Sequence, residues 1–419
     1  MTRDREPRIA YLTGRYPAVS HTFILREARA LRDLGVDVQP FSIWRSAPGE
    51  LLSAADRAEA DRTTSFLPLD PVAALRAQLA AAAASPRGYL RTVVRALRLA
   101  RAGVRGALVG LTWVLEATML WCECRERGLR HVHVHLNGTA PAVALLATEF
   151  ANRVDGGRPA HTWSMTVHGP SEFYDVEGEA LAEKVRGADF VACVSDFARS
   201  QLMALVDERE WGKLHVVHCG VDSAALGHER PAQDGSGAPV HVLTVGRLTQ
   251  VKGQAVLIDA VDRLTARGTD VRLTIVGDGP KRGELERIAE RAAAADGRIR
   301  FTGAVSQDEI ASYYESADVF ALSSFAEGIP VVLMEAMAYG VPVVATRVMG
   351  VGELVEDGRS GLLVNPGRSD LMADAIARLA ADPELSQTVR TAARATVERE
   401  FDVRRSAKRL AALFERYAQ

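Results

Sequence analysis

The chain has 419 residues, of which 47% are apolar and 25% charged, and its formal net charge is −2 at pH 7. This length allows two or three domains, each large enough to bury a core of its own. The balanced charge excludes a protein-wide attraction to nucleic acid or to membranes, so any such attraction needs a local patch, and we expect no nucleic-acid partner. The four cysteines form no paired C-x-x-C spacing, which indicates reduced thiols rather than a disulfide framework or a zinc site.

The sequence carries no pattern typical of export or membrane insertion. Its first residues, M-T-R-D-R-E-P-R, lead directly into a strand pattern without an apolar signal core. The longest apolar run, 107–121, contains Glu116 and is shorter than the roughly twenty residues that a spanning helix needs. We therefore expect a cytoplasmic protein with no spanning segment.

The N-terminal half begins with the pattern strand, glycine turn, helix, strand. Residues 8–13 read as a strand, Gly14 begins a turn, residues 20–34 have helical periodicity, and residues 36–42 form the next strand. This pattern is a βαβ unit. Ligands of such folds bind at the carboxyl ends of the strands, which makes Gly14 a candidate site residue.

Two strands that contain histidines follow later in this half. Residues 131–136 (H-V-H-V-H-L) alternate strictly and place three histidines on one face of a strand. No carboxylate or cysteine cluster accompanies them in the sequence, so we expect a structural role and no metal. Residues 163–168 form a further strand that ends in His168 before a Gly-Pro turn. A histidine at the tip of a strand points toward a ligand cleft rather than into the core.

A segment of different composition, about 67–120, lies between these strands. From Ala74 to Leu115 it contains seven arginines and no acidic residue. Six of them recur every three or four residues and predict a basic stripe on one helix: Arg87, Arg91, Arg95, Arg98, Arg101 and Arg105. Apolar residues form the other side: Leu90, Val94, Leu97, Val104, Leu108 and Leu111. The segment fits a surface helix packed on its domain or an amphipathic helix on an anionic membrane. Both hold if the apolar side packs inward while the arginines meet lipid headgroups.

The chain divides at residues 223–239, which are polar and rich in Gly, Pro and Ala. We expect a first domain at 1–222, a second at 240–403, and a final helix at 404–419 that crosses back to the first domain. In the second domain strands alternate with helices, which predicts a parallel sheet covered on both faces. The predicted strands are 240–246, 271–277, 299–302, 318–322 and 341–345. The predicted fold class is α/β, with two doubly wound Rossmann-like domains facing across a ligand-binding cleft.

The stretch 323–346 carries the clearest functional pattern in the second domain. It reads as a loop, a helix with Pro330 at its first position, a stop at Gly340, and a strand. The helix N-terminus, with the backbone N–H groups of Gly328 and Ile329, predicts a phosphate site, since Pro330 has no N–H. A carboxylate repels phosphate, so the neighbouring glutamates at 327 and 335 suit sugar hydroxyls better. A site that binds both phosphate and sugar hydroxyls indicates a nucleotide sugar as the ligand.

Two cations near the start of the second domain fit the same ligand. Arg247 and Lys252 follow its first strand, and together they can span a diphosphate and stabilise its developing charge without a metal. Gly277 and Asp278 begin G-D-G-P-K-R-G, which lacks the spacing of a dinucleotide fingerprint and predicts a nucleotide-facing loop. We expect Val305 to border the base.

These motifs resemble those of retaining glycosyltransferase family 4, which has the GT-B fold, and its exopolysaccharide or colanic-acid-type group. Glu327, seven intervening residues and Glu335, followed by A-M-A-Y-G-V-P-V-V-A-T, are similar to the family signature. G-R-L-T-Q-V-K-G, residues 246–253, resembles its phosphate-binding loop. The resemblance is specific over the second half and looser over the first, where His21 stands at a place that a glutamate commonly occupies in the family.

The resemblance implies transfer of a hexose from a UDP- or GDP-sugar to an acceptor hydroxyl with retention of configuration. The acceptor would be a sugar or a lipid-linked sugar in exopolysaccharide, glycolipid or natural-product biosynthesis, and no metal cofactor is implied. The enzyme would work in the cytoplasm, with peripheral contact to the inner membrane face as one interpretation of the arginine-rich segment.

Roles for single residues also follow from the resemblance. Gly14 would lie near the donor phosphates and the acceptor, and His168 would contact the donor sugar near the reacting centre. Glu335 would hold the ribose hydroxyls. Glu327 would contact the donor sugar or stabilise positive charge at the anomeric carbon. No carboxylate is placed as a covalent nucleophile, which favours front-face displacement, in which the leaving phosphate takes the acceptor proton.

Two other functions fit part of the pattern. A sugar-nucleotide epimerase of the same fold would need general acids and bases around the sugar, which the two glutamates resemble less. A sensor that binds nucleotide sugars without turnover could dispense with His168. Release of nucleoside diphosphate that depends on an acceptor would indicate a transferase, and interconverted sugar nucleotides would indicate an epimerase.

Overall fold

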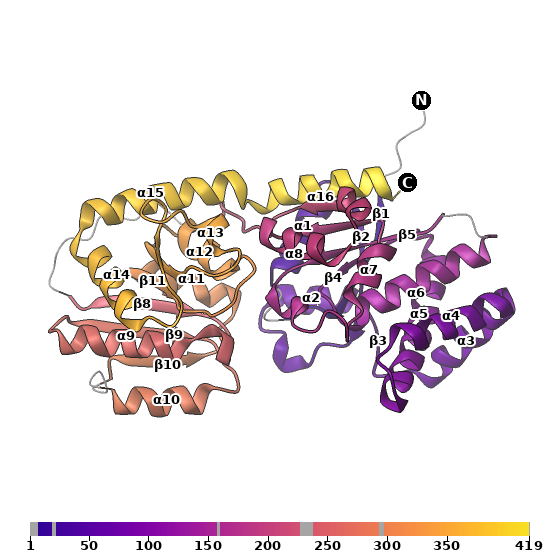
Figure 1. The fold of residues 1–419 in the computed structure, drawn as a ribbon, viewed down its shortest axis with the longest axis horizontal. Helices are drawn as coiled ribbons and strands as arrows, with labels where there is room; N and C mark the ends of the chain where they lie inside the picture. Colours follow the sequence, from indigo (N-terminus) through magenta and orange to yellow (C-terminus); the bar gives the residue numbers. More distant parts are fainter. Residues whose placement is uncertain (1–6, 19–21, 157–159, 227–237, 293–296, 419) are drawn as a thin grey trace. The chain divides into compact units, whose positions relative to one another are not determined.

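The computed structural model describes residues 7–18, 22–156, 160–226, 238–292 and 297–418 (Figure 1). They form two compact units. The first unit comprises Met1–Val217 together with Ser406–Gln419, and the second comprises His218–Arg405. The first predicted domain ends at residue 222 and the predicted last helix begins at 404, each within a few residues of these divisions. His21 and most of the predicted linker lie outside the described residues.

The first unit is built on a seven-stranded parallel sheet in the spatial order β3-β2-β1-β4-β5-β6-β7. Because the order runs outward in both directions from β1 and β4, this is the doubly wound arrangement of a Rossmann-like fold. The strands are β1 (Arg8–Arg15), β2 (Asp37–Trp44), β3 (Thr64–Leu67), β4 (His131–His135), β5 (Thr162–Val167), β6 (Phe190–Cys193) and β7 (Leu214–Val216).

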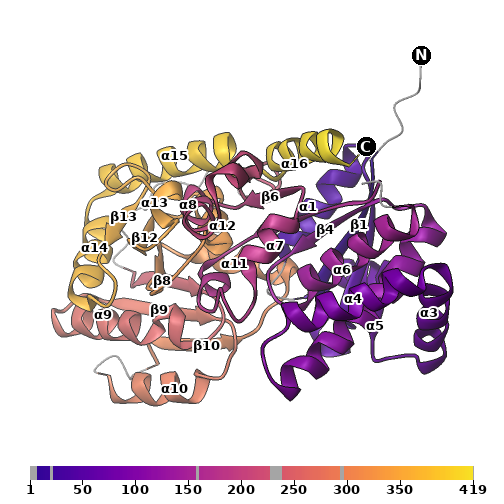
Figure 2. The ribbon, with the colours of Figure 1, turned by 45° about the vertical axis from the view of Figure 1, so that its right-hand side comes forward.

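Helices cover both faces of this sheet (Figure 2). They are α1 (Thr22–Asp33), α2 (Ala54–Arg62), α3 (Pro71–Ala84), α4 (Pro86–Leu99), α5 (Val104–Arg127), α6 (Thr139–Val154), α7 (Leu181–Gly187), α8 (Asp196–Leu205) and α16 (Val403–Tyr417). Successive side chains of β4 point to opposite faces of the sheet. Val132 and Val134 join the apolar core that contains much of α6, whereas the rings of His131 and His133 lie 5.5 and 5.1 Å from the ring of Phe414 in α16.

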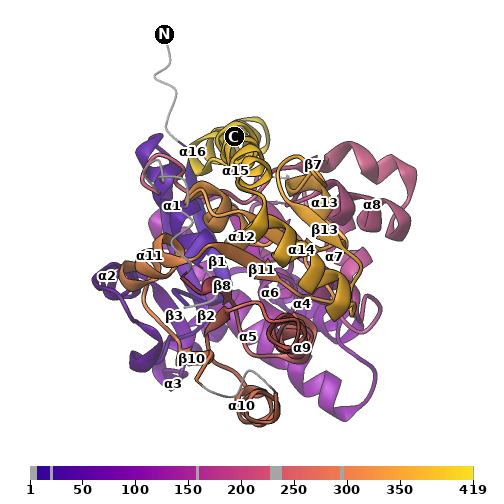
Figure 3. The same ribbon diagram turned by 90° about the vertical axis from the view of Figure 1, so that its left-hand side faces the viewer.

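The second unit has a six-stranded parallel sheet in the order β10-β9-β8-β11-β12-β13. The strands are β8 (Val240–Val245), β9 (Val271–Val276), β10 (Ile299–Gly303), β11 (Val319–Leu322), β12 (Val343–Thr346) and β13 (Leu362–Val364). The helices are α9 (Gln254–Ala266), α10 (Arg282–Arg291), α11 (Gln307–Ser316), α12 (Val331–Ala338), α13 (Val351–Leu354), α14 (Ser369–Ala381) and α15 (Pro383–Glu400). Helices α9 and α14 pack side by side, as Figure 3 shows. The predicted parallel Rossmann-like sheet is confirmed in each unit.

Three local predictions are wrong. Strand β1 continues to Arg15, which pairs with Trp44, so Gly14 lies within a strand and not in a turn. Pro330 is the N-cap of α12, with ψ at 116°, and the helix proper begins at Val331. The arginine-rich segment is three helices and not one, because Ser85 and the turn before Val104 interrupt it.

The expectation that the apolar side of the arginine-rich segment packs inward is also wrong. The buried residues of α4 are Gly88, Thr92, Ala96 and Leu99, whereas Leu90 is 64% exposed. Small residues let α4 approach its neighbours α5 and α6 closely, and this packing turns the larger side chains outward. The helix therefore buries its small residues and exposes its leucines.

Helix α5 is long and apolar enough to cross a membrane when judged only by length and composition, and half of its most apolar window is buried inside the protein. It packs against α3, α4 and α6 within the first unit. Trp113, Ala117 and Leu120 belong to the main apolar core of this unit. Such burial is typical of a core helix of a globular domain.

Candidate active site

The strand order of the second sheet determines where a ligand can bind to it. Strands β8, β9 and β10 follow each other in one direction, and the chain then returns to place β11 on the other side of β8. The order reverses between β8 and β11, and ligands of doubly wound sheets bind outside the carboxyl ends of the strands at this point. The loops after these two strands, 246–253 and 323–330, are the ones that carry the predicted phosphate-site residues.

These two loops are in direct contact. The Phe325 backbone N–H donates to the carbonyl of Val251 at 2.7 Å, and the hydroxyl of Ser323 donates to the carbonyl of Lys252 at 3.2 Å. Gly253 has a left-handed φ of 62°, and a Cβ atom there would lie 2.3 Å from the carbonyl oxygen of Ser323. Only glycine permits this approach, because any side chain would push the two loops apart.

The contact between the loops brings Lys252 and Glu327 together. The Lys252 Nζ lies 2.6 Å from Glu327 Oε1, and the hydroxyl of Ser324 donates to the same oxygen at 2.6 Å. The lysine ammonium has three N–H donors, so two remain for another ligand. Arg247 in the same loop is exposed, and its guanidinium forms no ion pair with the described residues. The site therefore offers one cation held by a glutamate and one unpaired cation.

Backbone N–H groups complete the anion-binding character of this region. Gly328 and Ile329 are buried, yet their backbone N–H groups donate to no acceptor in the described part of the chain. They precede α12, whose N-terminus adds a partial positive charge. Gly350 packs behind them, since a Cβ atom there would lie 2.2 Å from the carbonyl oxygen of Gly328. Buried donors of this kind are normally paired, so their geometry fits an anionic ligand such as phosphate.

Glu335 lies in the body of α12 and is almost completely buried. The hydroxyl of Tyr314 in α11 donates to its Oε2 at 2.9 Å, and the Tyr314 ring stacks on Tyr339 with 5.1 Å between centroids. The structure thus fixes the orientation of this carboxylate from a neighbouring helix. Its predicted role, ribose binding, stays a prediction.

The predicted nucleotide loop packs beside the cationic loop. The backbone N–H of Leu248 donates to the carbonyl of Asp278 at 2.9 Å, and Gly277, with φ at 134°, leaves no room for a side chain beside the carbonyl of Gly246. Asp278 is exposed and pairs with Arg282 at 3.4 Å. Val305 is half-buried just before α11. All the predicted residues of the second unit therefore lie on loops or helices at the carboxyl edge of its sheet.

In the first unit, His168 follows β5 and is half-buried, as a strand-tip histidine should be. Its Nε2 lies 2.8 Å from Nδ1 of His135, and Nε2 of His135 lies 2.5 Å from the hydroxyl of Tyr11. That hydroxyl in turn donates to Glu27, which also lies 3.3 Å from His135. A buried chain of polar groups thus orients His168 from three neighbouring elements.

The sequence did not reveal the group that shapes the loop around His168. Glu172 is buried in the short 3₁₀ helix 170–173 and accepts from the backbone N–H groups of His168, Gly169 and Asn137. These bonds connect the loops that follow β4 and β5. Desolvation by burial raises the pKa of Glu172 to about 7, against the lowering effect of the three N–H donors. Its spacing of three residues from Gly169 is that of a capping box, which is the one signal that could have indicated it.

Two of the three histidines of β4 contact hydroxyl groups of the neighbouring strand β5. His131 contacts the hydroxyls of Thr162 and Ser164 at 2.7 Å, and His133 contacts those of Ser164 and Thr166. Burial lowers the pKa of His131 to about 3, so both rings are neutral. Glu27, His133 and His135 have ligand atoms within 4.8 Å of one another, but hydroxyl partners already occupy both nitrogens of His133. This set does not fit a metal site.

Comparisons with known proteins match most of the second unit to a protein family. Residues 239–382 match the family described as Glycosyl transferases group 1. A GDP-mannose-dependent α-(1-6)-phosphatidylinositol monomannoside mannosyltransferase from Mycobacterium tuberculosis is 30% identical over 276 residues, 61% of this chain and 69% of that protein. The chain belongs to the group 1 glycosyltransferases.

Full-length similarity extends to a second glycosyltransferase and to solved structures. The amylovoran biosynthesis glycosyltransferase AmsK of Erwinia amylovora is 27% identical over 98% of this chain and 100% of its own. HepE of Anabaena, solved in complex with UDP-glucose, superposes with a TM-score of 0.69 at 19% identity, over 97% of this chain and 99% of that chain. This chain thus shares the two Rossmann-like α/β units of GT-B enzymes. The cleft expected between its units stays a prediction.

Proposed function

We propose that this glycosyltransferase transfers a hexose from a nucleoside diphosphate sugar to an acceptor hydroxyl, with retention of configuration and without a metal ion. The observation that carries the proposal is the anion site of the second unit. There, Lys252 contacts Glu327, the residue directly before the unpaired backbone N–H groups of Gly328 and Ile329, and Arg247 lies in the same loop as Lys252. Two cations and a helix N-terminus can bind a diphosphate and stabilise the charge that develops as it leaves.

The carboxylates suit the sugars of the same donor. Glu327 is anchored by Lys252 and Ser324 through a single oxygen, Oε1. Oε2 is left to accept from a donor-sugar hydroxyl or to face positive charge at the anomeric carbon. We assign Glu335 to the ribose, His168 to the donor sugar, and Gly14 to the neighbourhood of the phosphates and acceptor. Gly277, Asp278 and Val305 would line the base, which is uracil or guanine.

The transfer step would be a front-face displacement. The bond between the anomeric carbon and the leaving phosphate oxygen breaks, and a bond to the acceptor oxygen forms on the same face of the sugar. The acceptor proton passes to the leaving phosphate, so no protein base is required.

The names of two relatives support a biosynthetic setting. The protein similar over its full length is named as an amylovoran biosynthesis glycosyltransferase, and WcaL of Salmonella typhimurium, another similar protein, is named for colanic acid biosynthesis. We propose exopolysaccharide, glycolipid or natural-product assembly, with a sugar or lipid-linked sugar as acceptor.

Donor binding tests the proposal directly. Wild type should gain thermal stability with one UDP- or GDP-sugar from a panel, because a ligand that binds only the folded state stabilises it. Arg247→Ala and Lys252→Ala should each weaken binding of that donor by roughly tenfold to a hundredfold, the loss of one charge-assisted hydrogen bond to phosphate. Arg287→Ala on the exposed face of α10 is the control and should bind normally.

Product analysis distinguishes the alternatives. A transferase releases nucleoside diphosphate only with an acceptor, and proton NMR of the product should show the donor's anomeric configuration. Activity should survive a chelator. Interconversion of sugar nucleotides would replace the proposal by an epimerase. Unchanged donor affinity in both cation variants would remove Arg247 and Lys252 from the phosphate site.

A further inference from the structure

Three helices of the first unit expose an unusual number of apolar side chains. More than half of the exposed large apolar residues in the described part of the chain belong to α3, α4 and the first turns of α5. They recur at helical spacing: Leu75 and Leu79 on α3, Leu90 and Leu97 on α4, and Leu108 on α5. We call the exposed side of residues 71–111 the α3–α5 face. The three helices pack against one another within the first unit, where they lie side by side (Figure 1).

Arginines lie among these apolar residues without partners. Arg76, Arg87, Arg91, Arg98 and Arg105 are exposed and form no ion pair with any residue that the structure describes. No aspartate or glutamate occurs between Pro71 and Leu115, although the chain as a whole carries a net charge of −2. The α3–α5 face is therefore a local positive surface that also carries exposed apolar side chains.

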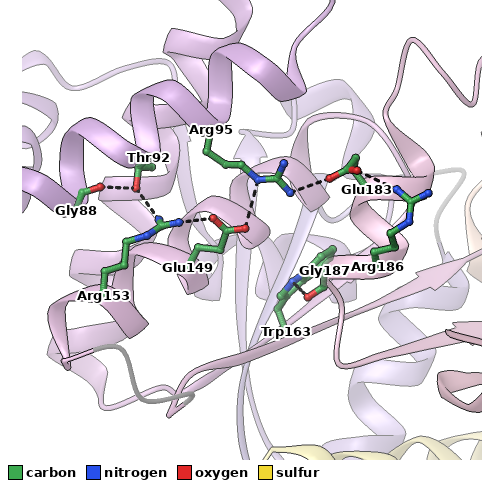
Figure 4. Close-up of polar contacts among 9 residues, drawn as sticks. All are labelled: Gly88, Thr92, Arg95, Glu149, Arg153, Trp163, Glu183, Arg186 and Gly187. Carbon is green, nitrogen blue, oxygen red and sulfur yellow. Dashed lines mark hydrogen bonds and ion pairs between the residues drawn. The ribbon is translucent and has the colours of Figure 1, made fainter. Parts of the chain in front are cut away.

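Ion pairs on the opposite side of α4 hold this face outward. Arg95 lies 3.4 Å from Glu149 of α6 and 3.1 Å from Glu183 of α7, and Arg153 of α6 lies 2.7 Å from the same Glu149 (Figure 4). Arg153 also donates to Thr92, a buried residue of α4, at 3.3 Å. These contacts fix the rotation of α4 about its own axis. Leu90 and Leu97, on the side away from them, remain 64% and 41% exposed.

We propose that the α3–α5 face docks on the surface of an anionic lipid bilayer. Amphipathic helices of this kind lie in the membrane interface with apolar side chains among the acyl chains, and arginines reach the headgroups along their flexible stems. A second copy of the chain would bring like charges together on this face, which opposes self-association. A nucleic acid would pair with the arginines but leave the leucines in water. A bilayer that contains anionic lipid satisfies both groups at once.

Vesicle flotation of the full chain tests this surface. Wild type should float with phosphatidylcholine vesicles that contain phosphatidylglycerol, and not with phosphatidylcholine alone. Binding should disappear at about 0.5 M salt, because the Debye length falls well below its 8 Å at physiological ionic strength. The triple variant Arg87→Gln/Arg91→Gln/Arg98→Gln should bind roughly a hundredfold more weakly, since each cation near such a surface contributes about a fivefold factor.

A second variant and a matched control separate the contribution of the apolar side chains from that of the arginine charges. Leu90→Gln/Leu97→Gln/Leu108→Gln keeps every charge and should still abolish binding. Arg272→Gln/Arg287→Gln/Arg378→Gln removes three exposed arginines of the second unit and should bind as wild type does. Urea unfolding should show all three variants folded, because the replaced side chains are exposed.

Several results would overturn the proposal. One is wild type that does not float with anionic vesicles, and another is equal weakening by the control variant. A third is size-exclusion chromatography showing a dimer that the leucine variant converts to a monomer, because a second copy would then cover the face. The readout is binding and not turnover, so it stands or falls independently of the proposed donor chemistry.

Discussion

Glu116 is a buried carboxyl in α5 whose ionisation should be visible in the stability of the whole protein. Its Oε2 has no hydrogen-bond partner among the described residues, and burial raises its pKa from 4.5 to about 7. Between these values the folded state binds more protons at this site than the unfolded state does. Stability therefore falls as pH rises through this window, by up to about 3 kcal/mol from this group.

Replacing Glu116 by glutamine should remove this dependence. Glu116→Gln keeps the shape of the side chain without the charge, so it should be more stable than wild type at pH 8 by about 2 to 3 kcal/mol and nearly equal to it at pH 4.5. Urea unfolding at the two pH values measures the difference. Glu172, whose pKa is also about 7, is present in both proteins and cancels in the comparison. Parallel pH profiles for the two proteins would show that Glu116 ionises normally.

At the scale of single residues, the sequence identifies candidate site residues more readily than it identifies the side chains that contact them. His168, Arg247, Lys252 and Glu327 stand at strand or helix ends, and local pattern is enough to identify such positions. Their partners depend on which strands become neighbours. His135 approaches the hydroxyl of Tyr11, 124 positions away, because β4 pairs with β1 in one particular register. No local spacing encodes that register, so the buried polar chain behind His168 could not be predicted.

Among the elements, the loop 246–253 depends on a glycine for its contact with the loop 323–330. Gly253→Ala would place a Cβ atom 2.3 Å from the carbonyl oxygen of Ser323 and force alanine into a left-handed φ. We expect a stability loss of about 1 to 3 kcal/mol and, because the loops separate, weaker binding of the nucleotide donor by at least tenfold.

Gly268→Ala is a control with the same backbone conformation. Gly268 has a φ of 85°, and a Cβ atom there would meet no heavy atom within 4 Å. Its alanine variant should lose a similar amount of stability but bind the donor as wild type does. Calorimetric titration of both variants measures the difference. Equal donor affinity in the two variants would mean that the loop contact does not shape the site.

The elements themselves were predictable where hydrophobic periodicity is strong. Strands β8 to β12 of the second unit fall close to their predicted positions, since buried parallel strands read as short apolar runs between glycine-rich turns. The prediction that the apolar side of the arginine-rich segment packs inward is wrong because periodicity alone does not say which side of a helix packs against the domain. Ala96 and Gly88 pack inward there, and Leu90 does not, because close approach between helices favours small residues. Strands β3, β7 and β13 stand at edges of the two sheets and have only three or four residues each, and the sequence pattern predicts no strand there.

On the scale of the whole molecule, the chain builds most of its first unit, then the second, and then returns to complete the first with α16. Phe414 of this helix is fully buried, and its ring contacts those of His131, His133 and Phe190. The first unit is therefore discontinuous in sequence, and its core depends on residues at the far end of the chain. Removing part of α16 should weaken the first unit while the second keeps its own core.

Phe414→Ala tests this division of stability. Truncating a buried phenylalanine costs about 3 to 5 kcal/mol, so calorimetry should show one unfolding transition lowered by roughly 10 °C. Leu264→Ala removes a buried side chain from the core of the second unit and should lower the other transition. If both variants instead lower a single shared transition, the two units unfold as one, and the contribution of α16 cannot be confined to the first. Separate shifts would show that residues 406–419 stabilise a domain that begins some 400 residues earlier in the chain.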